Sequence, residues 1–382
     1  MISAKSKLIY SLIIIISIIL FSGNFAKAQL VIENSLTPEE LVTQVLVGTG
    51  VSVSNVTYDG TNIQRCSFFD GDNTNLGIDA GVILTSGSIN EVSGDCNGDV
   101  STAHNTNFQD PDLVAISGHD MNDISRLEFD FIPQSDTLTF RYVFGSEEYE
   151  QFVCSDWNDA FGFFISGPGI NGPYTNNAEN IAIIPGSDPP LPVAINSVNS
   201  GVASQGYDPS ECESLAYSNL YVNNCDGSSL WTTIEYYGFT VVLTAYAVVQ
   251  PCQTYHIKLV LGDAGDQLYD SGVFLEANSF SSVGLTISTE FTSSGTSYGS
   301  FIEGCNDGTV YFELFEPVDH DYIIDFTVLG TATNGVDHTF VPPSLTIPMG
   351  ETIDSLFIEA FQDNIIEPTE TFVVAMDYES SC

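Results

Sequence analysis

The sequence contains very few basic residues. Lysine and arginine together number 7, against 50 aspartate and glutamate residues in a chain of 382. Lys5, Lys7 and Lys27 belong to the N-terminal segment, so the remaining chain keeps four basic residues against all 50 acidic ones, a net charge of −46. Binding to nucleic acid or to an anionic membrane surface requires clusters of cations. The charge balance therefore excludes both as partners.

The sequence also has only one long hydrophobic run, which lies at the N-terminus. Lys5 and Lys7 precede an apolar run over residues 8–21, and Ala26-Lys27-Ala28 forms a small-x-small cleavage site. This layout predicts a signal peptide over residues 1–28. The alternative is a membrane anchor, but the run is short for a span. We therefore expect a protein that is secreted or lies on the outer cell surface, with no membrane insertion after cleavage.

Motifs for catalysis are missing as well. The chain has no His-Glu-x-x-His and no Gly-x-Ser-x-Gly, since Phe164 stands where the second motif would need its first glycine before Ser166. Carboxylates are numerous enough that counting alone does not exclude a glycosidase. The histidines are scattered, and we expect surface or turn positions for His104, His119, His256, His320 and His338. The sequence predicts no enzyme.

Eight cysteines all follow the predicted signal peptide. An even number of cysteines in an exported chain indicates disulfides. No Cys-x-x-Cys occurs, which disfavours zinc and thioredoxin-like sites. We expect Cys212 to pair with Cys225 across a short polar loop, and the other pairings stay open.

The pattern of residues is that of a β-protein with one short helix. Thr37 as N-cap, Pro38 at the first helical position and Glu40 at the third form a capping box. Beyond it, short runs rich in Val, Ile, Thr, Phe and Tyr alternate with Gly, Asn, Asp and Pro turns. The expected strands cover 51–58, 81–85, 127–132, 137–144, 160–166, 233–248, 255–261 and 272–277. This pattern predicts an all-β, sandwich-type fold.

The length favours two domains. Small residues over 280–284 follow the last strand of the first block, and a new strand is expected over Leu285–Phe291. We therefore predict a first domain over 29–282 and a second over 283–382.

The first block resembles the choice-of-anchor L family of bacterial extracellular modules. The matching stretches, in order, are 76–87 (LGIDAGVILTSG), 140–149 (FRYVFGSEEY), 158–163 (NDAFGF), 166–169 (SGPG), 192–196 (PVAIN), 261–266 (LGDAGD) and 269–275 (YDSGVFL). Members of the family end in various surface-anchoring or sorting domains. The resemblance implies an extracellular module and no enzymatic activity.

The second block resembles a Calx-beta domain, an immunoglobulin-like β-sandwich. The matching stretches are 309–312 (TVYF), 330–337 (GTATNGVD), 347–351 (IPMGE) and 363–372 (DNIIEPTETF), with His338 in place of the family's tyrosine. The resemblance implies calcium ligands at Glu303, Asp337, Asp363 and Glu367. Gln362 and Asn364 flank Asp363 where the family often has consecutive aspartates, and fewer charges weaken a calcium site. Because 371–376 reads as a penultimate strand, we expect the last strand to be missing and the chain to be a fragment of a longer protein.

Acidic loops in the first block are further candidates for a calcium site. Glu147 and Asp159 lie with Glu148 and Asp156 in one short segment, and Asp263, Asp266 and Asp270 are spaced by three and four residues. Calcium binds six to eight oxygen atoms, which two such loops could supply together. Aspartates also stabilise turns through their own backbone. Both interpretations stay open, and Asp70-Gly71-Asp72-Asn73 lacks the distal Glu of a calcium loop.

These observations predict a non-catalytic, calcium-stabilised binding or adhesion module with an extracellular ligand, either a glycan or a surface protein. The alternatives are a non-catalytic part of a secreted carbohydrate-active enzyme and a structural spacer. Tyr149, Trp157, Tyr236 and Tyr237 could stack on sugars or fill a sandwich core.

Overall fold

The structure is a computed structural model. It describes residues 29–60, 66–96, 101–103, 106, 108–225, 233–282, 285–291, 307–314, 321–362 and 371–376. The predicted signal peptide (1–28) and the end of the chain (377–382) lie outside these residues. Within the described ranges, no helix has the length and apolar character needed to cross a membrane.

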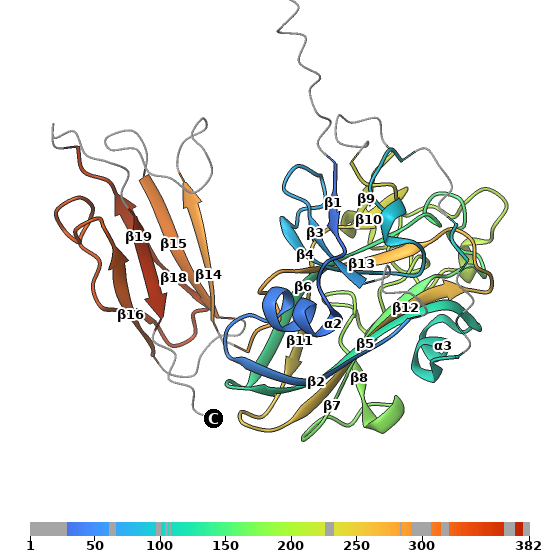
Figure 1. Ribbon diagram of the computed structural model, residues 1–382, viewed down its shortest axis with the longest axis horizontal. Helices are drawn as coiled ribbons and strands as arrows, with labels where there is room; N and C mark the ends of the chain where they lie inside the picture. The colour runs from blue at the N-terminus through green and yellow to red at the C-terminus, as the bar shows by residue number, and fades with distance from the viewer. Residues whose placement is uncertain are drawn as a thin grey trace, which may run out of the picture.

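The described residues up to 282, which we call the first unit, form two antiparallel sheets (Figure 1). One sheet has the order β1-β3-β4-β13-β6-β10-β9, and β11 also pairs with β6. Its strands are β1 (Val31–Glu33), β3 (Cys66–Asp70), β4 (Ala80–Thr85), β6 (Thr137–Ser146), β9 (Tyr221–Asn223), β10 (Gly238–Thr240), β11 (Leu243–Val248) and β13 (Ser271–Glu276). The other has the order β2-β5-β12-β7-β8. Its strands are β2 (Val51–Asp59), β5 (Met121–Pro133), β7 (Ala160–Ser166), β8 (Glu179–Asn180) and β12 (Tyr255–Ala264). The all-β, sandwich-type prediction is confirmed.

The main hydrophobic core lies between the two sheets. Alternate residues of β7, among them Phe161 and Phe163, face this core, while Phe164 faces a second cluster on the outer side beneath α3 (Pro111–Ser117). On the other sheet, Val273 and Leu275 face the main core and Phe274 packs into a cluster on the outer side. Strands covered on both faces must be apolar at nearly every position. This explains the continuous hydrophobic runs of β4, β7 and β13.

Helices are short. The predicted helix is present as α2 (Pro38–Glu40), continued by a π-helical turn η1 (Leu41–Leu46), and its capping box between Thr37 and Glu40 is formed. The helix α3 was not predicted, although Asp110 as N-cap, Pro111 at the first position and Gly118 at the C-cap are helix signals in the sequence. Single 3-10 turns are η3 (Ile89–Glu91), η4 (Thr175–Asn177), η5 (Pro209–Glu211) and η6 (Ser218–Leu220).

One predicted strand, 233–248, is wrong as a single element. Residues 238–240 and 243–248 form β10 and β11, which both pair with β6. Between them the amide of Val241 donates a hydrogen bond of 2.8 Å to the carbonyl oxygen of Leu220. The chain is therefore interrupted because a tertiary hydrogen bond replaces the ladder at that point.

The predicted Cys212–Cys225 disulfide is also wrong. Cys212 pairs with Cys154, and Cys225 pairs with Cys96. The short loop between Cys212 and Cys225 favoured a local pair, but β9 places Cys225 beside a distant loop. Cys252 is disulfide-bonded too, and Cys66 is a free, buried thiol.

The described residues from 285 onward, which we call the second unit, form two further sheets with a core of their own. One sheet has the order β14-β15-β18, with β14 (Leu285–Phe291), β15 (Asp307–Leu314) and β18 (Ile353–Glu359). The other has the order β17-β16-β19, with β16 (Tyr322–Gly330), β17 (Ser344–Ile347) and β19 (Phe372–Met376). In the core of the second unit, the rings of Phe312 and Phe326 stack with their centroids 5.6 Å apart. The strands expected over 285–291 and 371–376 are present.

Candidate functional site

Buried acidic side chains gather where several strands of the first unit begin or end. Ser146 at the end of β6 pairs with Ser271 at the start of β13, and Ala160 at the start of β7 pairs with Gly262 near the end of β12. The carboxylates beside these positions are almost completely shielded from solvent. We call them the carboxylate cluster: Asp123, Glu147, Glu148, Asp159, Asp263 and Asp270.

Asp159 joins strands of both sheets. Its Oδ1 accepts a hydrogen bond of 2.9 Å from the amide of Ala264 on β12, and its Oδ2 accepts one of 2.7 Å from the hydroxyl of Ser271 on β13. Each bond compensates part of the cost of burying a charged group. The loop before β7 is thereby fixed against both sheets.

Asp263 has much less compensation, although the side chain of Ser86 lowers its raised pKa in part. It is fully buried, and in the described structure neither of its carboxylate oxygens accepts a hydrogen bond. The nearby hydroxyl of Ser86 donates to the backbone carbonyl of Ser271 instead, over 3.3 Å. One oxygen of Glu148, Oε2, is likewise buried without a hydrogen-bond donor. Buried polar atoms without partners are rare and call for a missing ligand or proton.

Asp270 depends on a glycine beside it. Both of its oxygens accept from the amide of Thr102, each at 3.2 Å. A Cβ atom on Gly87 would collide with this carboxylate, so a larger residue after Ser86 would force the Asp270 side chain to move. The Ser-Gly pair after β4 thus makes room for an acidic side chain.

The pKa values of four carboxyl groups of the cluster are raised, those of Glu148, Asp159, Asp263 and Asp270. Burial is the main cause at Asp159 and Asp263, whose pKa values lie well above the usual value, and neighbouring acids including Asp270 raise them further. Burial and the charges of Asp159, Asp266 and Glu147 raise the pKa of Glu148 to about 11. Burial raises the pKa of Asp270 to about 7. Among the described residues, no basic side chain is a main cause of the shift in any of these four pKa values.

The structure brings together five of the acidic residues that the sequence singled out. Glu147, Asp159, Asp263 and Asp270 belong to the cluster, and Asp266 lies half-buried at its edge, where its Oδ1 accepts from the amide of Leu268. Asp123 was missed, because nothing in its sequence context distinguishes it from an ordinary residue at the start of a strand.

Of the four predicted ligands in the second unit, only Asp337 lies within the described residues. Its Oδ2 accepts from the amide of Thr333, which is a turn-stabilising bond. Glu303, Asp363 and Glu367 lie outside the described residues.

A comparison with protein families assigns the first unit. The family profile of the choice-of-anchor L domain matches residues 30–281. The chain belongs to this family. No curated protein and no solved structure is significantly similar to it. Membership, together with the disulfides, identifies a cell-surface or secreted bacterial protein.

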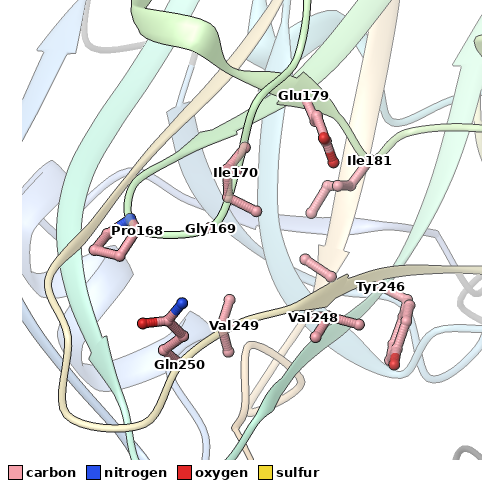
Figure 2. A pocket seen from close by; sticks show the side chains of 10 residues that line it. Pro168, Gly169, Ile170, Glu179, Ile181, Tyr246, Val248, Val249 and Gln250 are labelled. Atoms are coloured by element: carbon pink, nitrogen blue, oxygen red, sulfur yellow. The ribbon is translucent and has the colours of Figure 1, made fainter.

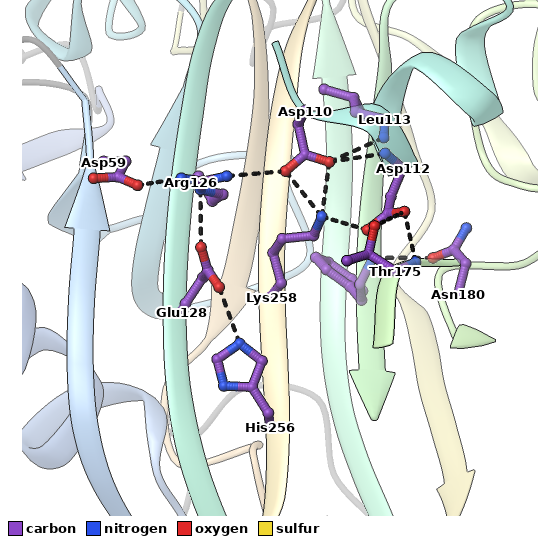
Figure 3. A network of polar contacts seen from close by, with 11 residues as sticks. Asp59, Asp110, Asp112, Leu113, Arg126, Glu128, Thr175, Asn180, His256 and Lys258 are labelled. Carbon is purple, nitrogen blue, oxygen red and sulfur yellow. Dashed lines mark hydrogen bonds and ion pairs between the residues drawn. The ribbon is translucent and has the colours of Figure 1, made fainter. Parts of the chain in front are cut away.

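The choice-of-anchor L module has a second polar cluster, on the outer face of the sheet that contains β5 and β12 (Figure 3). Lys258 Nζ lies 2.7 Å from Asp110 Oδ1 and 2.6 Å from Asp112 Oδ2. Arg126 bridges Asp110, at 3.2 Å, and Asp59. We call these five residues the ion-pair row, which anchors the first turn of α3 on the sheet.

Every charge of the ion-pair row has an internal counter-charge. Burial opposes ionisation of Asp112, but hydrogen bonds from Lys258 and Thr175 hold its pKa below the usual value. Beside the row, His256 contacts Glu128 at 2.9 Å and Asp130 at 2.8 Å. A cavity of about 150 Å³ opens next to these residues. Because their polar groups are engaged with one another, they provide neither a free base nor a free cation.

Two of the four aromatic residues that the sequence singled out fill the core. Tyr149 and Tyr236 are fully buried, so they fill the core. Trp157 is half-buried and packs against Gly265, next to the carboxylate cluster, and Tyr237 is half-buried as well.

Proposed function

We propose that this protein is a non-catalytic binding or adhesion module of the bacterial surface, and that calcium bound at the carboxylate cluster stabilises it. The observation that carries the proposal is Asp263, a fully buried carboxylate with two unpartnered oxygens among other acids. Four of the buried carboxyl groups have pKa values raised by burial and by neighbouring acids, so the cluster favours bound protons or a cation. Outside the cell, calcium is the cation whose preference for many oxygen ligands fits this set.

The fit requires some adjustment of side chains. Among the described residues, no three acidic, imidazole or thiol side chains surround one point closely enough to hold an ion as they stand. Asp263 and Glu148 have oxygens that are not held by hydrogen bonds, so these two side chains are the ones that can turn toward a cation. Backbone carbonyl oxygens and water would complete the coordination.

We extend the proposal to the second unit, as a Calx-beta-like domain with a calcium site that includes Asp337, Glu303, Asp363 and Glu367. Its support is the sequence resemblance together with the two described sheets around one core. The extracellular ligand of the whole module would be a glycan or a surface protein. A spacer role, or a place within a carbohydrate-active enzyme, are the competing functions.

The test is thermal unfolding with calcium at fixed ionic strength. Screening of a net charge of about −46 stabilises the fold in any salt. Specific binding adds a stabilisation of about 2.7 kcal/mol at a calcium concentration of 100 times Kd. We expect the melting temperature to rise with calcium in about 150 mM salt, and to rise less with magnesium, which requires a tighter octahedron.

Three variants locate the effect. Asp263→Asn should reduce the calcium-dependent rise in the melting temperature of the first unit. Asp337→Asn should reduce that of the second unit. Asp79→Asn removes one charge from an exposed position and is the matched control, which should respond to calcium as the natural protein does. A melting temperature that calcium leaves unchanged would contradict the proposal.

The absence of catalysis has its own test. The purified protein should turn over no glycan, peptide or ester in a substrate panel. Turnover that disappears in Glu147→Gln or Asp159→Asn would show that the carboxylate cluster is an active site.

A further inference from the structure

A groove opens along the side of the sandwich, next to β11 (Figure 2). Its volume is about 500 Å³. One wall comes from β11 and the residues after it, and the other from residues 168–170 and 179–181. Ile181, Ala247 and Val249 form an apolar floor and belong to the main core. Among the described residues that line the groove, Glu179 has the only charged side chain.

The groove runs beside a sheet edge. In the described structure β11 pairs with β6 and with no strand on its other side. Thr139 of β6 exchanges both of its backbone hydrogen bonds with Ser281, and the amide of Val249 bonds to Asp136. Hydrogen-bonded residues alternate along an antiparallel ladder. Ala245 and Ala247 therefore bond to β6, while the backbone groups of Thr244 and Val248 point away from it.

The other sheet edges of the first unit are protected. The strands β1, β8 and β9 have only two or three residues. The strand β2 is interrupted by a bulge at Asn55, whose φ is 56°. Short strands and bulges are the usual protection against pairing with another chain. In contrast, β11 has six residues without charge, proline or bulge, and Val248 is 64% exposed.

We propose that the edge of β11 and its groove bind an extended peptide segment of a partner protein. The peptide would extend the sheet as a new strand, with hydrogen bonds to the backbone of Thr244 and Val248. Alternate apolar side chains would enter the groove above Ile181 and Val249. A lysine or arginine would lie near Glu179, and the net charge of the chain favours a basic partner over a second copy of this protein.

The experiment uses the mature chain and a displayed library of random ten-residue peptides. We expect selected peptides to alternate apolar residues and to contain a lysine or arginine. On binding, the amides of Thr244 and Val248 should exchange with solvent at least tenfold more slowly. The amides of Ala245 and Ala247, which bond to β6, should exchange slowly with or without peptide.

Two variants at one position separate the backbone contribution from the side chain. Val248→Pro removes an amide that points away from β6, so the ladder to β6 stays intact, and proline is tolerated on edge strands. It should weaken peptide binding at least tenfold. Val248→Thr keeps the amide and the branched shape, and should bind within about twofold of the natural protein.

Several results would overturn the proposal. They are a selection that yields no peptide, peptides that bind Val248→Pro as tightly as Val248→Thr, and bound peptides that leave the exchange at Thr244 and Val248 unchanged. Protection of these amides by saccharides, with none by peptides, would assign the groove to a glycan instead.

Discussion

The two polar clusters of the first unit, the ion-pair row and the carboxylate cluster, differ in how their buried acids are neutralised. Both place acidic side chains out of contact with water. In the ion-pair row, Lys258 and Arg126 neutralise Asp110 and Asp112 within the chain. In the carboxylate cluster, the described charged groups that raise the pKa values of Asp159, Asp263 and Asp270 are other acids. Two of the four basic residues beyond residue 28 lie in the row, and the raised pKa values of the cluster favour protons or cations from solution.

The largest effect should come from removing the counter-charge of the row. Lys258→Met leaves Asp110 and Asp112 buried with less neutralisation, and breaking a buried ion pair costs about 3–5 kcal/mol. We expect the free energy of unfolding, measured with urea, to fall by that amount. Arg141→Met is the matched control, because Arg141 is half-exposed and its pair with Glu276 contributes under about 1 kcal/mol. Equal losses in both variants would show that the row is no more important than a surface pair.

Removing one acid should change stability in opposite directions at the two clusters. Without calcium, Asp263→Asn removes a buried carboxyl group whose oxygens have no hydrogen-bond partner and supplies amide donors to neighbouring carboxyl groups, so we expect a gain of about 1–3 kcal/mol. Asp110→Asn keeps the helix cap but removes a partner of Lys258 and Arg126, so we expect a loss of similar size. Urea unfolding in EDTA measures both. A loss at Asp263 would mean that the cluster is stabilised by protons that the aspartate shares.

The smallest effect concerns His256, at the side of the row. Hydrogen bonding to Glu128 and Asp130 raises its pKa above the usual value of 6.5 in the folded protein. The protonated histidine therefore stabilises the fold fully below about pH 6.5, its usual pKa. This stabilisation is lost as the pH rises through the pKa of His256 in the folded protein. Because the ring is 39% exposed, the effect should stay below about 1 kcal/mol.

The comparison for this prediction is the difference in stability between the natural protein and His256→Gln, measured from pH 5.5 to 8.5. That difference should be largest at acid pH and shrink toward alkaline pH. A difference that does not depend on pH would show that the histidine acts only through packing.

Much of the fold follows from local patterns. The capping box at Thr37 and Glu40, and the strands β2, β4 and β7, have signals that lie within a few residues of one another. The same holds for the missed helix α3, since Asp110, Pro111 and Gly118 mark its ends. The interruption between β10 and β11 had no local signal, because it depends on a hydrogen bond to Leu220.

The candidate site was only partly accessible to prediction. Glu147, Asp159, Asp263, Asp266 and Asp270 could be found because each lies in a short segment rich in acidic residues. Asp123 joined them only through the register of β5 with β12, which places the start of one strand beside the end of the other. The disulfide partners of Cys212 and Cys225 likewise depend on which loops meet in space.

The sequence by itself determined the class of fold and the shortage of positive charge, because strand periodicity and composition are properties of the chain read in order. Tertiary structure decided how that shortage is distributed. Lys258 lies 146 residues from Asp112, and Asp159 lies 112 residues from Ser271. Whether an acid meets a cation, a hydroxyl or another acid is settled only when strands that are distant in sequence pair side by side.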